Sequence, residues 1–224
     1  MVFVKPRLPV TLSSTESSRR RFDYRFVLSP AFIALQAGNI LQSLGYFIPG
    51  IYLPSYAQNL GMNQASSTAT VALLNTMGVI GSISVGFLID SLHVTTVLVI
   101  FALGSALSVL LLWGLCAGPA LLLVFSAAYG FFASPYTTTY TGMVREVRRQ
   151  SPGAETGLIF GLLSAGRGIG SVVSGPLSEA LVKSMNAHGG KTGYDSKYEN
   201  LIIVTGLSVA LGGLGFGARR VGWL

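Results

Sequence analysis

Long apolar stretches alternate with short polar connections along most of the 224-residue chain. Because about 20 apolar residues in a helix cross a hydrocarbon core of roughly 30 Å, each stretch has the length of a transmembrane helix. Six such stretches follow a polar leader, at 30–58, 66–90, 94–115, 118–142, 154–182 and 199–218. The pattern predicts an all-α membrane protein, with a leader over 1–29, a six-transmembrane-helix bundle over 30–218 and a short tail over 219–224.

Two polar segments refine these limits. The fourth stretch contains SPYTTTYT (134–141), which is polar for a helix in contact with lipid, so we expect it to face protein or water. The segment SPGAE (151–155) has the residue order of a helix start, with Ser151 as N-cap and Pro152 at the first helical position. We expect the fifth helix to begin in this segment.

Composition agrees with a membrane location. Only 10% of the residues are charged, against about 25% in ordinary soluble domains. Half of the residues are hydrophobic, the mean hydropathy is +0.60, and the 28 glycines suit transmembrane helices. The net charge of +7 comes from short clusters between apolar stretches, not from one basic face. This distribution argues against nucleic acid as a partner.

The residues of common catalytic and metal sites are scarce. Cys116 is the one cysteine of the chain, and His93 and His188 lie far apart with no HExxH motif or paired carboxylates nearby. A disulfide within the chain, a cysteine metal site and hydrolytic metal chemistry are therefore excluded. We expect no metal, no cofactor and no enzymatic activity. The leader also lacks the apolar core of a signal peptide, so we expect it to be cytoplasmic.

Lysine and arginine are distributed unevenly between alternate connections, which indicates orientation. With the leader inside, nine arginines lie on the inner side and three lysines on the outer side. The inner set is Arg19, Arg20, Arg21, Arg25, Arg145, Arg148, Arg149, Arg219 and Arg220, and the outer set is Lys183, Lys191 and Lys197. We expect both termini to be cytoplasmic and the connection 183–198 to be external.

One arginine interrupts the fifth stretch. Arg167 lies in SAGRGIGSVVSGP (164–176), whose glycines suggest either a phosphate-binding loop or a membrane helix. A GxGxxG loop needs a glycine where this chain has Ser171, and it needs a preceding strand, whereas GLIFGLLSA (157–165) belongs to a long apolar run. These differences exclude a soluble nucleotide-dependent enzyme.

Helical spacing divides the fifth stretch into two predicted sides. Polar residues recur at intervals of three and four, and small residues recur at intervals of four. The polar stripe is Ser164, Arg167, Ser171, Ser174 and Ser178; the small residues are Gly157, Gly161, Ala165 and, one row over, Gly166 and Gly170. We expect the small residues to pack on neighbouring helices and the stripe to be hydrated.

A charge at the depth of Arg167 needs an explanation. An arginine in the middle of a membrane helix costs about 2.5–3.5 kcal/mol and normally faces a cavity or a partner. A permanent positive charge suits an anion, so Arg167 is the main candidate for substrate binding. The alternative is an anchor that snorkels to the interface. A position about ten residues into the helix lies roughly 15 Å deep, which favours the anion site.

The first stretch supplies further candidates. It carries the polar residues Gln36, Asn39, Gln42, Ser43 and Tyr46. Pro49 and Pro54 follow, and each removes a helical hydrogen bond, as in the interrupted helices that line transporter sites. We select Asn39 and Tyr46 for substrate binding and both prolines for gating. The tyrosines of this stretch have an alternative role as an interfacial aromatic belt.

Three positions in later stretches complete the candidate set. Asn75 lies on a polar line with Thr68 and Ser82 and either binds substrate or hydrogen-bonds a neighbouring helix. Tyr129 in the fourth stretch has the same two alternatives. Asp90 ends the second stretch, where a carboxylate opposes the helix dipole, so we expect a cationic or N–H partner.

Several segments together resemble the fungal monocarboxylate-permease-like branch of the major facilitator superfamily. They are PRLP (6–9), SPAFIALQAGNILQSLGYFIPGIYLPSYAQNLG (29–61), the GxxxD of Gly86 and Asp90, and FGLLSAGRGIGSVVSGPLSEAL (160–181). The similarity covers nearly the whole chain and corresponds to helices seven to twelve of such a carrier, preceded by its central loop.

The resemblance implies a fold and a function. Members have twelve helices in two halves that rock around a midplane site, and they usually move a small anion with a proton. The partners implied are membrane lipid, a small organic anion, a proton, and a missing N-terminal half or a second copy. Gly86 and Asp90 resemble a loop motif whose aspartate contacts the other half, so we expect Asp90 to stay unsatisfied in this half alone. Asn75 and Val79 replace the Asp and Arg of animal carriers, which puts their coupling mechanism in doubt.

Two functions remain open on this basis. The first is secondary-active, proton-coupled transport of a monocarboxylate-like anion by a truncated or half carrier, with Arg167, Asn39, Tyr46, Asn75 and Tyr129 at the site. The second is a non-transporting half carrier that acts as a structural or regulatory membrane partner. For either we expect a multi-pass protein of the plasma membrane, not of a vacuolar or other internal membrane.

Overall fold

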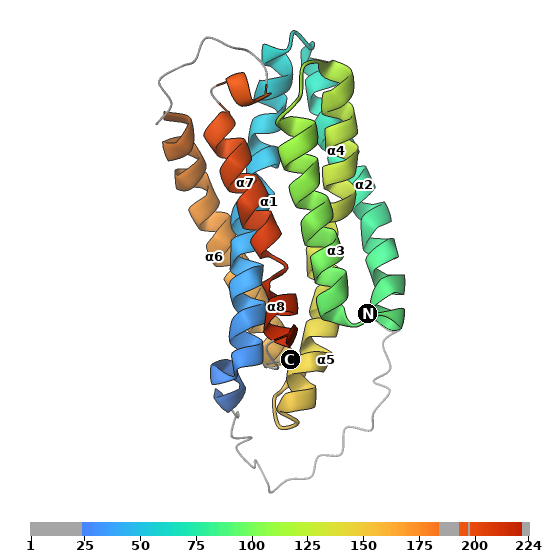
Figure 1. The fold of residues 1–224 in the computed structure, drawn as a ribbon, viewed down its shortest axis with the longest axis vertical. Helices are drawn as coiled ribbons and strands as arrows, with labels where there is room; N and C mark the ends of the chain where they lie inside the picture. Colours follow the sequence, from blue (N-terminus) through green and yellow to red (C-terminus); the bar gives the residue numbers. More distant parts are fainter. Residues whose placement is uncertain (1–23, 184–192, 197, 221–224) are drawn as a thin grey trace, which may run out of the picture.

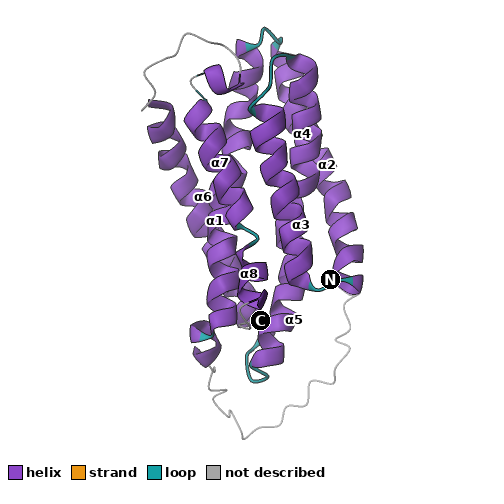
Figure 2. Ribbon diagram, viewed as in Figure 1, coloured by secondary structure: helices purple, strands orange, loops and turns teal. Residues whose placement is uncertain are grey.

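The computed structural model describes residues 24–183, 193–196 and 198–220, and these contain helices and loops but no strand (Figure 2). Figure 1 shows the long helices side by side in one elongated bundle. The helices are η1 (Tyr24–Leu28), α1 (Pro30–Asn59), α2 (Gln64–Ser91), α3 (Val94–Leu107), the π-helical η2 (Ser108–Trp113), α4 (Pro119–Ala133), η3 (Ser134–Thr139), α5 (Tyr140–Gln150), α6 (Thr156–Lys183), η4 (Gly193–Asp195), α7 (Glu199–Leu211) and α8 (Leu214–Arg220). The all-α membrane fold predicted from the sequence is confirmed.

Five helical segments of the described chain are long and apolar enough to cross a membrane. They are Pro30–Asn59, Gln64–Ser91, Val94–Trp113, Pro119–Gln150 and Thr156–Lys183. The first two begin at caps that the sequence supplies: the Ser29 hydroxyl accepts from the Phe32 N–H at 3.2 Å, and the Asn63 side chain accepts from the Ser66 N–H at 2.8 Å. Helix α1 continues through both Pro49 and Pro54.

The prediction of one continuous sixth helix over 199–218 is wrong, because this segment forms two helices. Helix α7 ends at Leu211 and α8 begins at Leu214, with a turn over the two glycines between them. Glycine is the weakest helix former after proline, and here it also permits close contacts. The Tyr136 hydroxyl donates to the Gly212 carbonyl at 3.0 Å, and a side chain at Gly38 would meet that same carbonyl.

The fourth helix differs from its predicted limits of 118–142. It continues through the 3-10 segment η3 and α5 as far as Gln150, so the arginines around position 148 lie on its last turns and not in a loop. Pro135, Tyr136 and Tyr140 of the SPYTTTYT segment are buried, whereas Thr137 and Thr141 are exposed, so one side of this polar segment faces protein.

The predicted helix start at SPGAE is also wrong. Ser151 ends α5, because its N–H donates to the Val147 carbonyl at 2.9 Å, and the Ala154 N–H then donates to Ser151 in a turn. Proline disfavours helical geometry in the residue before it, and a Pro-Gly pair favours a turn. The fifth transmembrane helix therefore begins later, at Thr156.

Small residues of α6 pack on α1 along one row only. Gly166 and Gly170 are buried against Gln36 and Ser43, with no room for a side chain at either glycine. The other predicted row, made of Gly157, Gly161 and Ala165, is exposed, so it does not pack on a helix of the described chain.

The polar stripe of α6 divides in the same way. Ser164 is exposed and Arg167 is half-buried, but Ser174 and Ser178 are buried and donate to carbonyls of their own helix. The stripe is therefore accessible only in its first half, and the expectation that all of it is hydrated is wrong. The close packing on α1 explains why its second half is covered.

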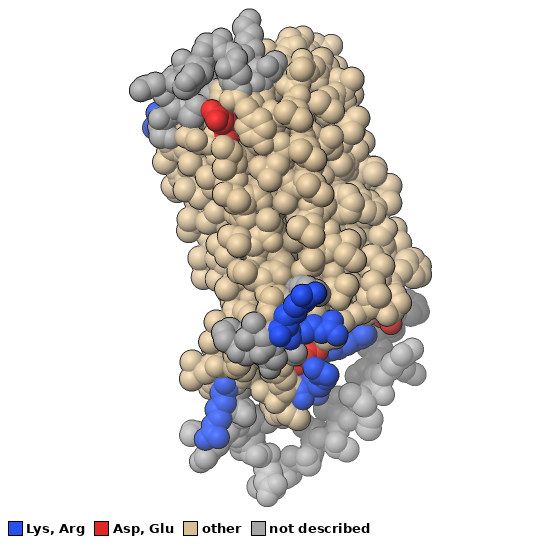
Figure 3. All heavy atoms as spheres, in the orientation of Figure 1, with Lys and Arg blue, Asp and Glu red and all other residues tan. Residues whose placement is uncertain are grey.

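Charge is confined to the ends of the bundle in the face that Figure 3 shows. Most of the visible Lys and Arg gather at the end where α5 and α8 terminate, and the side between the ends carries other residues. This end holds arginines that the sequence places on the inner side, including Arg145, Arg149 and Arg219. Its cytoplasmic orientation stays a prediction.

Candidate functional site

Arg167 lies near the middle of α6 and extends toward α1. Its Nη1 donates to Gln42 Oε1 at 2.9 Å, and its Cζ lies 4.7 Å from the centre of the Tyr46 ring and 5.5 Å from that of Phe47. Within the described ranges it forms no ion pair. The side chain of Tyr140 also interacts with Arg167. A half-buried guanidinium is thus held by neutral polar groups and two aromatic faces, which stabilise the positive charge without neutralising it.

Gln42 fixes the direction of this arrangement. The residue is buried, and its Nε2 donates to the Ala133 carbonyl of α4 at 3.2 Å. Because the amide nitrogen is used in this way, the amide oxygen is the end directed at Arg167. Sequence reasoning noted Gln42 as a polar residue of the first helix but did not select it.

Tyr46 and Tyr129 form the wall beside the guanidinium. Their rings are stacked with centres 6.5 Å apart, and the Tyr46 hydroxyl donates to the Ser134 hydroxyl at 3.3 Å. Tyr129 is buried, and its hydroxyl lies 3.5 Å from the Gly45 carbonyl and 3.3 Å from that of Tyr46. Pro49 has no N–H for the Gly45 carbonyl, so Tyr129 supplies a donor from α4 in its place.

Asn39 is placed differently from the other selected residues. It is fully buried, its Nδ2 donates to the Leu163 carbonyl at 2.7 Å, and its Oδ1 accepts from the Tyr140 hydroxyl at 2.8 Å. Both ends of the amide are therefore used to join α1 to α6 and α5. This geometry gives Asn39 a helix-packing role next to the site.

Asn75 and Tyr46 meet at a cavity between α1 and α2. The cavity has a volume of about 180 Å³ and is lined by Tyr46, Phe47, Gly50, Val71, Leu74 and Asn75. Asn75 is exposed, and its Nδ2 donates to the Val71 carbonyl of its own helix at 3.0 Å. Tyr46 is therefore the shared neighbour of three other predicted residues. It contacts Arg167, stacks on Tyr129 and lines the cavity with Asn75.

The other predicted gating residues lie away from this cavity. Pro54 is one turn beyond Pro49 in α1, and Gly86 is in α2 with open space beside it. Asp90 lies at the end of α2, where its Oδ1 is 3.8 Å from Arg145 Nη1 of α5, and both side chains are mostly exposed. The expectation that Asp90 is unsatisfied in this half is wrong, although the contact is a loose one.

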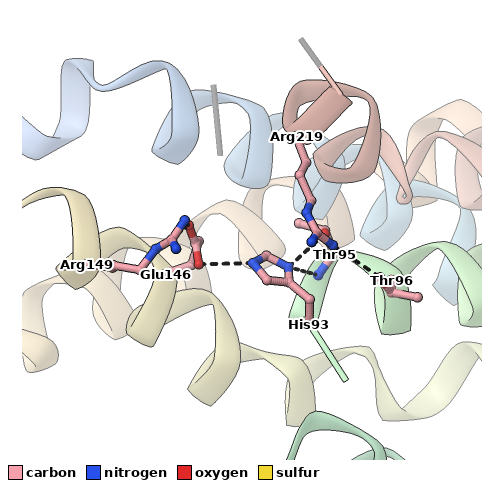
Figure 4. Close-up of polar contacts among 6 residues, drawn as sticks. All are labelled: His93, Thr95, Thr96, Glu146, Arg149 and Arg219. Atoms are coloured by element: carbon pink, nitrogen blue, oxygen red, sulfur yellow. Dashed lines mark hydrogen bonds and ion pairs between the residues drawn. The ribbon is translucent and has the colours of Figure 1, made fainter. Parts of the chain in front are cut away.

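Sequence reasoning missed a polar cluster at the basic end of the bundle (Figure 4). Figure 4 shows the His93 ring between Glu146 and Thr95, with Arg149 on the far side of Glu146 and Arg219 directed at Thr96. Glu146 Oε2 lies 3.3 Å from His93 Nε2, and its Oε1 accepts from Arg149 at 2.9 Å. The spacing of Glu146 and Arg149, three apart on a helix, was the one available signal.

This cluster has the features of a structural junction. The Glu146 side chain is 7% exposed, whereas that of Arg149 is 66% exposed, so a buried carboxylate is compensated from the surface. His93 is also the N-cap of α3, and its Nδ1 lies 2.8 Å from the Thr95 hydroxyl. The cluster joins the α2–α3 turn to α5. In the described part of the chain no three His, Cys, Asp or Glu residues are arranged to hold a metal ion.

Comparison with known proteins identifies the family. The sequence profile of the Major Facilitator Superfamily matches residues 13–221, which is most of the chain. The chain belongs to the Major Facilitator Superfamily. As a member of this superfamily it is an integral membrane protein, and its relatives are transporters.

Curated relatives of this superfamily member are fungal and animal proteins. It is 28% identical to the MFS transporter asaE of Aspergillus flavus over 195 residues, which are 86% of this chain and 41% of that protein. It is 29% identical to the agnestins efflux protein AgnL12 of Paecilomyces divaricatus over 157 residues (69% and 36%), and 24% identical to the monocarboxylate transporter 12-B of Danio rerio over 188 residues (80% and 39%). The chain spans about two fifths of the length of these relatives.

Proposed function

We propose that this chain is one half of a secondary-active transporter that moves a small monocarboxylate-like anion, together with a proton, across the plasma membrane. The observation that supports this function best is the Arg167 guanidinium, which is half-buried in a membrane helix and held by neutral groups. A membrane protein retains such a charge at a cost of a few kcal/mol, and an anionic substrate would offset that cost when bound.

The surroundings of Arg167 suit a carboxylate. A guanidinium presents several N–H donors in a plane and can bind both oxygens of a carboxylate, while Gln42 occupies only one of its nitrogens. In this proposal Arg167 contacts the anion, and Tyr46 and Asn75 form the pocket wall. Tyr129 and Asn39 hold the wall and the helix in place. Pro49, Pro54, Gly86 and Asp90 are proposed to act in the conformational change.

The name of one relative agrees with the proposed class of substrate, and the name of another states a direction of transport. The zebrafish relative is named a monocarboxylate transporter, and one fungal relative is named an efflux protein. We therefore carry over the carboxylate class and leave import and export as alternatives for measurement.

Two exposed helix faces support the proposal that a second half completes the site. Helices α2 and α6 expose large apolar side chains along much of their length, including Val79, Ile83 and Phe87 on α2 and Ile169 and Val172 on α6. We propose that these faces contact an N-terminal half or a second copy, with both termini of this chain in the cytoplasm. The same faces would also serve a non-transporting half carrier that regulates another membrane protein.

Transport by the reconstituted chain tests this function. Purified chain in liposomes should take up radiolabelled lactate or pyruvate faster when a proton gradient is imposed. Arg167→Gln should abolish the uptake, and Arg167→Lys, which keeps the charge and loses the planar donors, should retain part of it. Uptake that is unchanged in Arg167→Gln, at equal protein content, would end the anion-site assignment. No uptake by the wild-type chain would exclude autonomous transport and leave two roles, a half that transports only with an N-terminal half and the regulatory half carrier.

A further inference from the structure

The cavity beside the aromatic wall is apolar over most of its surface. Phe47, Val71, Leu74 and the Tyr46 ring line it, and the exposed residues Gly50 and Asn75 are at its rim. The Tyr46 hydroxyl is directed away to Ser134, so the ring of this residue is what the cavity presents. Such a surface stabilises hydrocarbon in preference to a charged or strongly hydrated group.

The size of the cavity is informative. Its volume is about 180 Å³, and an apolar protein cavity of about 150 Å³ is known to accept a benzene molecule. The two-carbon body of lactate or pyruvate would leave most of this space without contacts. A six-membered ring or a branched chain of similar size would fill it.

The cavity and the proposed anion site share two aromatic residues. Tyr46 and Phe47, which line the cavity, are also the two rings that contact the Arg167 guanidinium, at 4.7 and 5.5 Å. A carboxylate on Arg167 would therefore hold its own hydrocarbon body against these rings. The positive charge and the apolar cavity together fit a ligand with one anionic end and one bulky apolar end.

We propose that the substrate is an aryl or branched-alkyl monocarboxylate whose apolar body occupies the cavity between α1 and α2, a proposal that rests on the anion-binding role given to Arg167 above. Phe47, Gly50, Val71 and Leu74 are then the residues that select the body of the substrate. The smallest monocarboxylates are poor ligands by comparison, because they gain only the contact with Arg167.

A substitution at Gly50 tests directly whether the cavity selects the apolar body of the substrate. A Cβ atom built on Gly50 meets no atom within 4 Å, so a leucine at this position would project into open space at the cavity and not into a neighbouring helix. Leucine is also a better helix former than glycine, so α1 is not weakened. Gly157 of α6 is a matched control, since it is exposed, has nothing within 4 Å and is outside the cavity.

The test is ligand binding to the complete chain in lipid nanodiscs, followed by saturation-transfer NMR, with empty nanodiscs as the background. The probes are benzoate, lactate and the neutral benzyl alcohol. Benzoate should bind about tenfold more tightly than lactate, as expected when about 60 Å² of apolar surface is buried. Gly50→Leu should weaken benzoate about tenfold and leave lactate within twofold, while Gly157→Leu should change neither.

A second variant keeps the test valid if Gly50→Leu does not fold. Val71→Ala enlarges the same cavity, so it should improve the binding of 2-naphthoate relative to benzoate. Equal binding of benzoate and lactate, with no effect of either cavity variant but loss of both ligands in Arg167→Gln, would overturn this inference and leave the proposed function intact. Benzyl alcohol binding as tightly as benzoate would overturn it as well. If no carboxylate binds, or if Arg167→Gln binds like the wild type, the anion site itself is wrong.

Discussion

The amide oxygen of Gln42 lies 2.9 Å from Arg167 Nη1, and the amide nitrogen of the same side chain is bonded to the Ala133 carbonyl. Three helices, α1, α4 and α6, are therefore connected through one buried glutamine. The connection positions the guanidinium without supplying a negative charge. A neutral partner of this kind leaves the full positive charge available to a ligand.

Replacing that neutral partner by a charged one should inactivate the site. Gln42→Glu places a carboxylate beside Arg167, so the guanidinium gains an internal counter-ion and we expect anion affinity to fall at least about tenfold. Gln42→Ala removes the partner but keeps the positive charge, and it should retain binding. Titration of benzoate into both variants measures the difference, and equal affinities in the two variants would contradict the role given to Gln42.

Alanine substitutions at Gly168 and Gly170 of α6 should change the free energy of unfolding in opposite directions. A Cβ on Gly170 would collide with the α1 backbone, 2.7 Å from the Ile40 carbonyl oxygen, whereas a Cβ on Gly168 meets nothing within 4 Å. Gly170→Ala should lower the free energy of unfolding by about 1–3 kcal/mol. Gly168→Ala should raise it by about 0.5–1 kcal/mol, because alanine is the better helix former.

Reversible denaturation by SDS in mixed micelles measures both glycine variants on one scale. The comparison is internally controlled, since the two positions are in the same helix and receive the same side chain. A loss of stability in both variants, or in neither, would be inconsistent with the packing row described for α6.

Asn39 and Tyr140 should behave as one stabilising unit. Their hydrogen bond of 2.8 Å is buried, and membrane hydrogen bonds of this kind contribute about 0.6 kcal/mol on average and up to about 1.7 kcal/mol. We expect Asn39→Ala and Tyr140→Phe each to reduce stability, and the double variant to lose less than the sum. The double-mutant cycle gives the coupling energy directly.

The same variants separate packing from substrate binding at Asn39. If Asn39 only joins helices, benzoate affinity in Asn39→Ala should stay within about threefold of the wild type under conditions where the variant is folded. A much larger loss of affinity, with stability little changed, would instead support the direct contact with substrate that the sequence suggested.

Removing the Arg149 side chain should lower the free energy of unfolding more than removing the charge of Glu146. Arg149→Ala leaves the 7% exposed carboxylate of Glu146 with His93 as its remaining contact, whereas Glu146→Gln leaves an arginine that is 66% exposed and free to hydrate. We expect a loss of about 1–3 kcal/mol for Arg149→Ala and less than about 1 kcal/mol for Glu146→Gln. Unfolding midpoints at neutral pH show which of the two variants loses more stability. Arg148→Ala, at the neighbouring position, is the control for removing an arginine outside the cluster.

Local sequence signals predicted the helices well. Apolar stretches of transmembrane length depend on residues within a few positions of each other, and these predicted the limits of α1 and α2 within about two residues. Local signals failed where proline and glycine permit more than one structure. The segment around Pro152 forms a turn, and the pair Gly212–Gly213 ends a helix that the apolar pattern continues.

Contacts between distant residues limited the prediction of the site. Spacing along α6 yields two rows of small residues that look equivalent, and only the position of α1 decides that Gly166 and Gly170 are the packed row. In the same way, Arg167 stands out as a charge in an apolar helix, but its partner Gln42 is 125 residues away. Helical periodicity does not distinguish Gln42 from Asn39 three positions earlier, so the amide that contacts Arg167 was not among the residues selected from the sequence.

The hydroxyl that Tyr129 places near the carbonyl freed by Pro49 has a mechanical consequence. The carbonyl left without the N–H of Pro49 has a donor that belongs to α4, not to α1 itself. Tyr46 is the next residue after the carbonyl that Tyr129 contacts, so a displacement of α4 along its axis would tilt the aromatic ring that faces Arg167. A movement that begins far from the ligand would in this way alter how tightly the ligand is held.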